Sequence, residues 1–189
     1  MAYSTYTTEA IVCGVKDSYT SDRSYLLFTE AAGMLWASAR SVREERSKQR
    51  FALQAFSMVR VSLVRGRSGW RIGSVESQRN YYQVADTRSE RGAVVRMVKL
   101  LRRLLQGEEP QPALYALTVS ALDAVSMNPT TAALVADHFC FNALHNLGYI
   151  PPHQEYQDLL VSDVTWSELS ALPALADQAI ERALEQSHL

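Results

Sequence analysis

The sequence predicts an α+β protein in which a five-stranded β-barrel, residues 1–82, precedes an α-helical bundle, residues 83–189. Two observations support this prediction. The first part of the chain consists of short β-favouring runs separated by turn residues, whereas the second part repeats apolar residues at helical spacing. The change between the two patterns falls near Asp86. A chain of 189 residues is also long enough for two small domains.

Three strands are expected before residue 40. Residues 10–15 are apolar and β-favouring, and the turn-rich segment 17–22 follows them. Residues 25–29 and 34–39 are the next two strands. The turn between them ends at Gly33, and glycine adopts positive φ at little cost. The three strands are expected to form a meander.

Two further strands are expected downstream. Residues 58–64 alternate between apolar and polar side chains, as a half-buried strand does. Residues 65–69 turn the chain, and residues 70–77 return as the fifth strand. Gly73 interrupts the alternation of this strand, which predicts a bulge or a bend. Five short strands favour a small barrel.

A long amphipathic helix is expected to begin after a cap at Asp86, Thr87 or Ser89, to run to about residue 105 and to end before Gly107. At 100° per residue, its apolar and cationic side chains lie on opposite arcs. The apolar arc contains Val94, Met97, Val98, Leu100, Leu101, Leu104 and Leu105. The cationic arc contains Arg88, Arg91, Arg96, Lys99, Arg102 and Arg103.

Three more helices are expected over residues 112–126, 130–147 and 173–187. Pro173 suits the first turn of the last helix. The pair Pro151-Pro152 and the polar residues after it separate the last two helices. Together with the amphipathic helix, these segments form the predicted bundle.

The charges are distributed unevenly along the chain. Residues 1–107 hold 18 of the 19 Lys and Arg residues and 9 of the 20 Asp and Glu residues, which gives a net charge of +9. Residues 108–189 hold 11 acidic residues and only Arg182, which gives −10. This asymmetry favours either a polyanionic partner for the first half or mutual neutralisation of the two halves, and the two explanations can coexist.

Several classes of protein are not expected. No apolar run approaches the ~18 residues of a membrane span, and residues 1–8 are polar and unlike a signal peptide. We therefore expect a soluble, cytoplasmic protein with no membrane partner. Cys13 and Cys140 have no C-x-x-C or other ligand spacing, so neither a disulfide framework nor a cysteine zinc site is expected.

Catalytic motifs are also missing from the sequence. No phosphate-binding loop, dinucleotide fingerprint, nucleophile elbow or H-E-x-x-H pair occurs, so neither an enzyme nor a cofactor is expected. Asp137, His138, Cys140 and His145 come closest to a metal cluster, but the two histidines are about 10 Å apart along one helix. We interpret them as ordinary helix residues and predict no metal site. A metal-dependent nuclease or phosphoesterase that uses carboxylates such as Asp137 is a weaker alternative.

Cations are concentrated in residues 40–50, directly after the third strand. The five cationic residues are Arg40, Arg43, Arg46, Lys48 and Arg50. Aromatic residues flank them or follow in the barrel sequence, namely Trp36, Phe51, Phe56, Trp70, Tyr81 and Tyr82. Cations track the phosphates of single-stranded nucleic acid, and aromatic rings stack on its bases. Most aromatic residues of a small barrel belong to its core, so the prediction of a nucleic-acid contact depends mainly on the cations.

At several positions the chain resembles the RecO family of bacterial recombination mediators. The resembling segments are residues 9–12, 22–33, 39–40, 47–56 and 65–70, which include Ser-Lys-Gln-Arg-Phe-Ala-Leu-Gln-Ala-Phe and Gly-Arg-Ser-Gly. Leu-Gly-Tyr-Ile-Pro at residues 147–151 is similar to the Leu-Gly-Tyr-x-Pro that closes a helix in the family's second domain. The likeness covers most of the chain and is strongest over residues 9–77.

Two departures from the family pattern affect what the resemblance implies. Ala55 stands where the family usually has proline. Many relatives place zinc-binding cysteines after the Leu-Gly-Tyr-x-Pro segment, whereas residues 152–158 contain none, and the chain is shorter than typical members. The resemblance therefore implies a short form that lacks the zinc-binding cysteines and has a reduced second domain.

The resemblance implies an oligonucleotide-binding (OB-fold) barrel as the DNA-binding domain at residues 1–82 and a helical domain at residues 83–189. It implies single- and double-stranded DNA as partners and the annealing of complementary strands. It also implies work with RecR and single-strand-binding protein to load recombinase, in the bacterial cytoplasm at the nucleoid.

We therefore expect a non-enzymatic DNA-binding mediator whose cations contact DNA phosphates. The expected DNA-binding residues are Arg40, Arg43, Arg46, Lys48, Arg50, Arg65, Arg67, Arg71, Arg88, Arg91 and Lys99. The acidic tail of single-strand-binding protein is expected at Arg102, Arg103 and Leu105. The helix cations are equally suited to pair with the acidic second half. The alternative function is a non-catalytic interaction scaffold with the same fold and little DNA affinity.

Overall fold

The structure is a computed structural model of residues 1–189. It describes all of them except residues 1–4, 18–21, 43, 45, 46, 48, 68, 161–165, 167, 168, 188 and 189. The chain divides into two compact units. The barrel unit combines Met1–Val84 with Leu105–Tyr115, and the helical unit combines Ala85–Leu104 with Ala116–Leu189. We call the segment Leu105–Tyr115 the strap. In sequence it lies between the two parts of the helical unit, but it belongs to the barrel unit.

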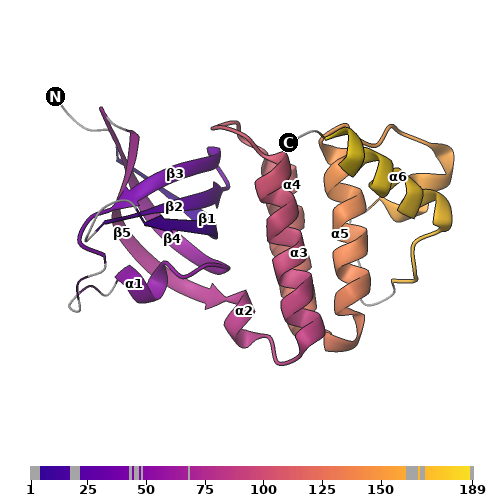
Figure 1. The fold of residues 1–189 in the computed structure, drawn as a ribbon, viewed down its shortest axis with the longest axis horizontal. Helices are drawn as coiled ribbons and strands as arrows, with labels where there is room; N and C mark the ends of the chain where they lie inside the picture. Colours follow the sequence, from indigo (N-terminus) through magenta and orange to yellow (C-terminus); the bar gives the residue numbers. More distant parts are fainter. Residues whose placement is uncertain are drawn as a thin grey trace. The chain divides into compact units, whose positions relative to one another are not determined.

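Five strands close into a barrel in the order β1-β2-β3-β5-β4 (Figure 1). Their bounds are Thr5–Asp17 for β1, Arg23–Thr29 for β2, Gly33–Ala39 for β3, Ser57–Gly66 for β4 and Gly69–Asn80 for β5. All neighbouring strands are antiparallel except β3 and β5, which pair in parallel and complete the closure. The predicted five-stranded barrel is confirmed.

The predicted irregularity at Gly73 is confirmed by the register between β4 and β5. Val61 pairs with Val75, but Leu63 pairs with Ile72, so β5 uses one extra residue at this point. Gly73 lies inside the shift. An extra residue bends a strand and increases its twist, which a small closed barrel requires.

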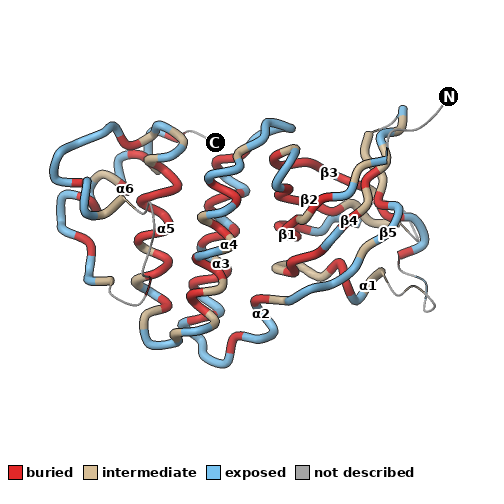
Figure 2. Tube along the Cα trace, turned by 180° about the vertical axis from the view of Figure 1, so that it is seen from behind, coloured by how far each residue is buried: buried red, intermediate tan, exposed pale blue. Residues whose placement is uncertain are grey.

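The barrel core is formed by side chains that alternate along the strands, and Figure 2 shows these buried positions in red. The fully buried members include Ala10, Val12, Leu27, Val59, Val61 and Leu63. The predicted alternation over residues 58–64 therefore separates an inner from an outer face of β4. Burial of apolar surface at about 25 cal/mol per Å² is the main term that stabilises such a core.

Apolar residues at the end of the strap are buried in the barrel unit. Leu114 and Tyr115 are both buried. The Tyr115 ring packs edge-on against Phe28 with 5.4 Å between ring centroids, and its hydroxyl donates to the Met58 sulfur at 3.5 Å. Burial raises the pKa of Tyr115 far above its ordinary value, so the hydroxyl stays protonated and remains a donor. These contacts fix the C-terminal end of the strap to the barrel.

The β2–β3 turn contacts the middle of the strap at Gly33. Gly33 has a φ of +69°, as the sequence predicts. A Cβ at this position would lie 2.0 Å from the Glu109 carbonyl oxygen. Gly33 is therefore required twice, once for the conformation of the turn and once for the close approach of the strap backbone.

The helical unit confirms the predicted bundle. Its elements are α3 (Arg88–Leu104), α4 (Pro112–Met127, which begins within the strap), η1 (Pro129–Thr131), α5 (Ala132–Asn146), η2 (Gln154–Leu159) and α6 (Ala174–Gln186). The helix α3 packs against α5, and α5 packs against α6. Among the described residues, no helix combines the length and the apolar character that a membrane crossing requires.

The start of α3 is a capping box, which settles the choice among the three predicted caps. The Glu90 backbone N–H donates to the Thr87 hydroxyl at 3.2 Å, and the Thr87 N–H donates to the Glu90 carboxylate at 2.7 Å. Thr87 is therefore the N-cap. Hydrogen bonds that the Glu90 carboxylate accepts from the side chain and the backbone of Thr87, with a further one from the Asp86 N–H, lower the pKa of Glu90 below its ordinary value.

One local prediction needs correction. The sequence predicts a continuous loop over residues 40–50, but Arg50 lies in the short helix α1 (Gln49–Ala52). The Leu53 N–H donates to the Gln49 carbonyl at 2.9 Å, which closes the helical turn. A four-residue helix is too short to produce a helical repeat in the sequence. A second short helix, α2 (Tyr81–Val84), follows β5.

Candidate nucleic-acid interface

The basic segment begins at the end of β3. Arg40 is exposed, and the backbone N–H of Ser41 donates to the Asp22 carboxylate at 2.9 Å, which ties this end of the segment to the residue before β2. The predicted DNA-binding residues Arg43, Arg46 and Lys48 lie outside the described residues. The structure therefore locates the two ends of the cationic segment, Arg40 and Arg50.

Arg50 forms the best-defined part of this surface. Its guanidinium carbon lies 4.6 Å from the centroid of the Phe51 ring, and the Phe51 side chain is 63% exposed. Within the described part of the chain, Arg50 Nε is buried with no hydrogen-bond partner. A cation held on an exposed ring offers both features that single-stranded nucleic acid requires, namely a charge for phosphate and a face for a base.

A pocket of about 410 Å³ lies beside Arg50, between the helix α1 and the ends of β1 and β2. The residues that line it are Val15, Asp17, Arg23, Arg50, Leu53, Gln54 and Ala55. Arg23 Nε donates to Asp17 at 2.8 Å. This hydrogen bond raises the pKa of Arg23 further above its ordinary value, so the side chain keeps its charge. The pocket thus has two cations, one carboxylate and an apolar part.

The β4–β5 hairpin lies beside the basic segment because β3 and β5 pair in parallel. Ser38, which precedes Arg40 by two residues, is the cross-strand partner of Arg71. The Gln49 side-chain amide donates to the Gly73 carbonyl at 3.1 Å, which also fixes α1 to β5. The fold therefore places Arg65 and Arg71 on strands that adjoin the cationic segment, and Arg67 lies in the turn between these two strands.

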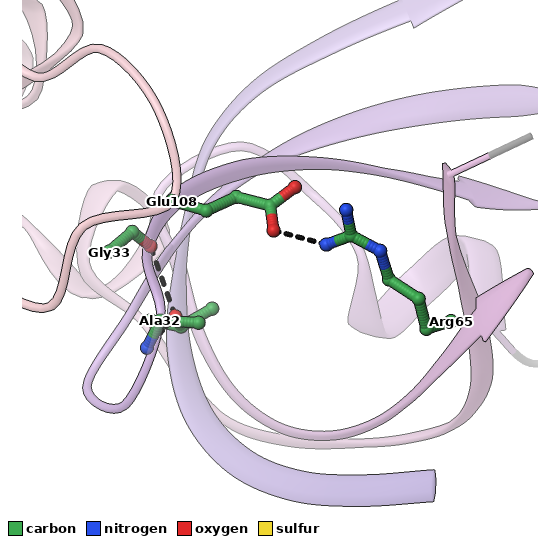
Figure 3. A network of polar contacts seen from close by, with 5 residues as sticks. Ala32, Gly33, Arg65 and Glu108 are labelled. Atoms are coloured by element: carbon green, nitrogen blue, oxygen red, sulfur yellow. Dashed lines mark hydrogen bonds and ion pairs between the residues drawn. The ribbon is translucent and has the colours of Figure 1, made fainter. Parts of the chain in front are cut away.

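The three hairpin cations have different surroundings. Arg67 is exposed at the turn, and Arg71 is half-buried on β5. Arg65 forms an ion pair with the carboxylate of Glu108 in the strap (Figure 3). Its guanidinium carbon also lies 4.8 Å from the centroid of the Trp70 ring. Glu108 is not among the residues that the sequence predicts for the site, although an acidic pair at residues 108–109 directly after a basic half is a visible signal.

The aromatic candidates separate into exposed and buried rings. Trp36 is 46% exposed and Tyr82 is 41% exposed, and Tyr82 stacks on Phe56 with 5.3 Å between ring centroids. Tyr81, by contrast, is 2% exposed and is not available to a base. Trp70 is half-buried and packs against the barrel core.

Several cations of α3 make contacts within the helical unit. Arg91 donates to the Ala85 carbonyl at 2.8 Å, and Arg96 forms an ion pair with Asp137 of α5. The predicted DNA-binding residues Arg88 and Lys99 are exposed, as is Arg102.

The predicted tail-binding residues are not equivalent. Arg103 donates to the Leu184 carbonyl and, at 3.1 Å, to the Ser187 carbonyl, so it caps the C-terminus of α6. Leu105 is 9% exposed and belongs to the barrel unit, whereas Arg102 and Arg103 belong to the helical unit. The assignment of this trio to a tail stays a prediction.

Two of the four candidate metal residues of α5, Asp137 and His138, contact other groups of the protein. His138 Nε2 lies 2.9 Å from the Ser170 carbonyl, and Asp137 is paired with Arg96. Burial raises the pKa of the Cys140 thiol to about 11. No three His, Cys, Asp or Glu residues of the described chain lie in an arrangement that could hold a metal ion.

A closed barrel with the strand order β1-β2-β3-β5-β4, followed by a helical domain, defines a class of proteins with an N-terminal OB-fold. A family model described as "Recombination protein O N terminal" matches residues 1–81, and one described as "Recombination protein O C terminal" matches residues 91–155. The chain belongs to the RecO family.

Individual relatives agree with the family models. The "DNA repair protein RecO" of Myxococcus xanthus is 35% identical over 152 residues, which cover 77% of this chain and 60% of the relative. The protein of the same name from Desulfitobacterium hafniense is 29% identical over 77% of this chain and 53% of the relative. The one from Dehalococcoides mccartyi is 25% identical over 79% and 59%. The chain thus spans between about half and three fifths of the length of these relatives.

Proposed function

We propose that the barrel unit binds single-stranded DNA and that the protein anneals complementary strands and assists recombinase loading in recombinational DNA repair. The arrangement of Arg50 on the exposed Phe51 ring, at the end of a segment with five cations, is the observation that carries this proposal. Membership of the RecO family supports it, because the relatives are named DNA repair proteins.

Annealing fits this surface for a physical reason. Two DNA strands repel each other through their phosphates, and a cationic protein surface reduces that repulsion. Exposed aromatic rings bind single-stranded DNA because its bases stack on them. The process needs no nucleophile, metal or redox cofactor. We therefore propose a non-enzymatic mediator, with residues 1–82 as its DNA-binding domain and residues 83–189 as its helical domain.

The first test is a salt titration of binding to an unstructured oligonucleotide. Replacing Arg43, Arg46 and Lys48 by alanine should lower the slope of log K against log salt by about 2, since each phosphate contact of a single strand contributes ~0.7. Arg60→Ala is the matched control for a lost charge, because Arg60 lies on β4 between Glu9 and Glu76 of the neighbouring strands. If the triple variant lowered the slope by no more than three times the effect of Arg60→Ala, a specific contact would be contradicted.

The second test separates charge from stacking at the defined end of the surface. Phe51→Ala should weaken binding by about 1–3 kcal/mol if a base stacks on this ring. This loss should change little with salt, because no charge is removed. Circular dichroism should show an intact barrel, since the Phe51 side chain is mostly exposed. Unchanged affinity would mean that the ring does not stack on a base.

A scaffold with little DNA affinity is the second candidate function. It is favoured by the cations that already have partners, namely Arg65, Arg96 and Arg103. Binding that is absent at low salt, or that does not depend on salt, would make the scaffold the better proposal.

We further propose that RecR and single-strand-binding protein are partners. For the acidic tail of single-strand-binding protein, Arg102→Glu should weaken the binding of a tail peptide, while Arg88→Glu at the other end of α3 is the control with the same charge change. Arg102 is preferred to Arg103 for this test because Arg103 caps α6. Equal affinities of both variants and the wild type would contradict the site.

A further inference from the structure

The ion pair between Arg65 and Glu108 joins a predicted DNA-binding cation to a carboxylate of the same chain. Arg65 lies at the end of β4, and Glu108 lies in the strap, 43 residues later. Figure 3 shows the two side chains pointing toward each other, with the β2–β3 turn at Ala32 and Gly33 beside the strap. The side chains are 50% and 42% exposed, so solvent and ligands reach both of them.

The strap is held in this position by contacts that do not involve the ion pair. Its C-terminal end is buried through Leu114 and Tyr115. Its middle is so close to Gly33 that a Cβ would lie 2.0 Å from the Glu109 carbonyl oxygen. Glu108 precedes this contact by one residue. The strap backbone therefore keeps residue 108 near the barrel whether or not the Glu108 side chain is paired with Arg65.

Arg65 is oriented by aromatic residues of the barrel. It is the cross-strand partner of Trp70, and its guanidinium carbon lies 4.8 Å from the centroid of that ring. The Tyr6 ring packs against Trp70 with 5.7 Å between centroids. The ring limits the positions that the guanidinium can take, and an oriented guanidinium binds the two oxygens of a carboxylate or of a phosphate in the same way.

We propose that Arg65 is a phosphate-binding residue of the barrel and that Glu108 occupies its site when DNA is absent, so that the strap competes with DNA. This inference rests on the proposed function and adds a regulation to the same surface. The competition is modest, because an exposed ion pair contributes only ~0.2–1 kcal/mol. DNA therefore displaces Glu108 when neighbouring cations bind at the same time, whereas an isolated anion does so poorly.

The proposal predicts that Glu108→Gln tightens the binding of a short oligothymidylate at low salt by about 2–5-fold, which corresponds to an exposed ion pair. Glu109→Gln is the matched control. It removes the same charge one residue away, from an exposed residue whose backbone rather than side chain packs on Gly33. This control should give a clearly smaller increase, because it reports only the change in net charge.

Arg65 makes the test specific. In an Arg65→Ala background, Glu108→Gln should no longer exceed Glu109→Gln, since the site for which carboxylate and phosphate compete has been removed. Fluorescence anisotropy gives the affinities, and thermal melting of each variant verifies that the fold is kept.

The outcomes separate this inference from the proposed function. Equal effects of Glu108→Gln and Glu109→Gln on a wild type that binds DNA would overturn the competition alone. An advantage of Glu108→Gln that persists without Arg65 would also overturn the competition and leave the proposed function intact. Absence of DNA binding in the wild type and in every variant would instead overturn the proposed function.

Discussion

The barrel unit and the helical unit use their cations differently. In the barrel unit, Arg40 and Arg67 are exposed and have no ion pair within the described part of the chain, and Arg50 lies on an exposed ring. In the helical unit, Arg96 is paired with Asp137 and Arg103 caps α6. Cations of the first kind are available to a polyanion, whereas cations of the second kind stabilise the unit that contains them.

This difference bears on how the uneven charge of the sequence is used. A count of +9 in residues 1–107 does not distinguish a binding surface from internal neutralisation. The structure assigns examples of internal pairing to the helical unit, at Arg96 and Arg103. Exposed cations lie in both units, around the basic segment and the hairpin of the barrel and also at Arg88, Lys99 and Arg102 of α3. Arg65 of the barrel unit is both paired and accessible, because it forms an ion pair with Glu108 and its side chain is exposed.

The largest effect on this comparison is expected from Gly33→Ala, which acts on the barrel unit. Positive φ costs an L-residue about 1–2 kcal/mol, and overpacking against the Glu109 backbone costs about 1–3 kcal/mol more. We expect the barrel to lose about 2–5 kcal/mol of unfolding free energy, measured in urea, and the Tyr115 amide to lose protection from hydrogen exchange as the strap moves away.

Gly92→Ala is the control in the helical unit. Gly92 lies in α3, and a Cβ there would meet no atom within 4 Å. Alanine favours a helix interior over glycine by about 0.8–1 kcal/mol, so this variant should be more stable than the wild type. If both glycine variants changed stability by the same amount and sign, the close contact between strap and turn would have no energetic role.

A smaller effect is expected from Arg103→Ala, which tests the internal use of cations in α3. The variant removes hydrogen bonds from a guanidinium to the last carbonyls of α6, which should cost about 1–2 kcal/mol and reduce amide protection in α6. Arg102→Ala removes the neighbouring exposed cation and should change stability by less than about 0.5 kcal/mol. Equal losses would mean that the two arginines have the same structural role.

The capping box of α3 predicts a pH dependence. The pKa of Glu90 is lowered in the folded protein, so its contribution to stability is complete above the ordinary pKa and is lost as the pH falls through the lowered value. Thr87→Ala removes the cap and should cost about 1 kcal/mol near pH 7. The difference in unfolding free energy between the wild type and Glu90→Gln should decrease in the acidic range. A difference that stayed constant from pH 7 to pH 3 would contradict the role of the carboxylate.

Features that depend on local sequence could be predicted. The turn at Gly33, the bulge at Gly73 and a cap near Thr87 each follow from a backbone conformation or a hydrogen bond within a few residues. The alternation of residues 58–64 and the spacing of α3 likewise report which face is buried, because burial follows the repeat of the element. The resemblance to the RecO family and the five strands of the barrel are likewise recognisable in short segments of the sequence.

Features that depend on distant pairs could not be predicted. The sequence places the strap in the helical domain, because nothing in residues 105–115 indicates a backbone contact with Gly33. The same holds for Arg103, whose partners are carbonyls 81 and 84 residues later. The spacing of α3 predicts its exposed face correctly, but a periodic pattern does not report which cation on that face finds a partner.

The smallest expected effect concerns metal. We expect substoichiometric zinc in the purified protein and a melting temperature that a chelator leaves unchanged within about 1 °C. Of the four candidate donors of α5, Asp137 is paired with Arg96 and His138 contacts the Ser170 carbonyl. The raised pKa of Cys140, about 11, opposes the thiolate form that a metal requires. A fall of more than about 2 °C with chelator, which corresponds to roughly 0.5–1 kcal/mol in a protein of this size, would show that a structural metal stabilises the chain.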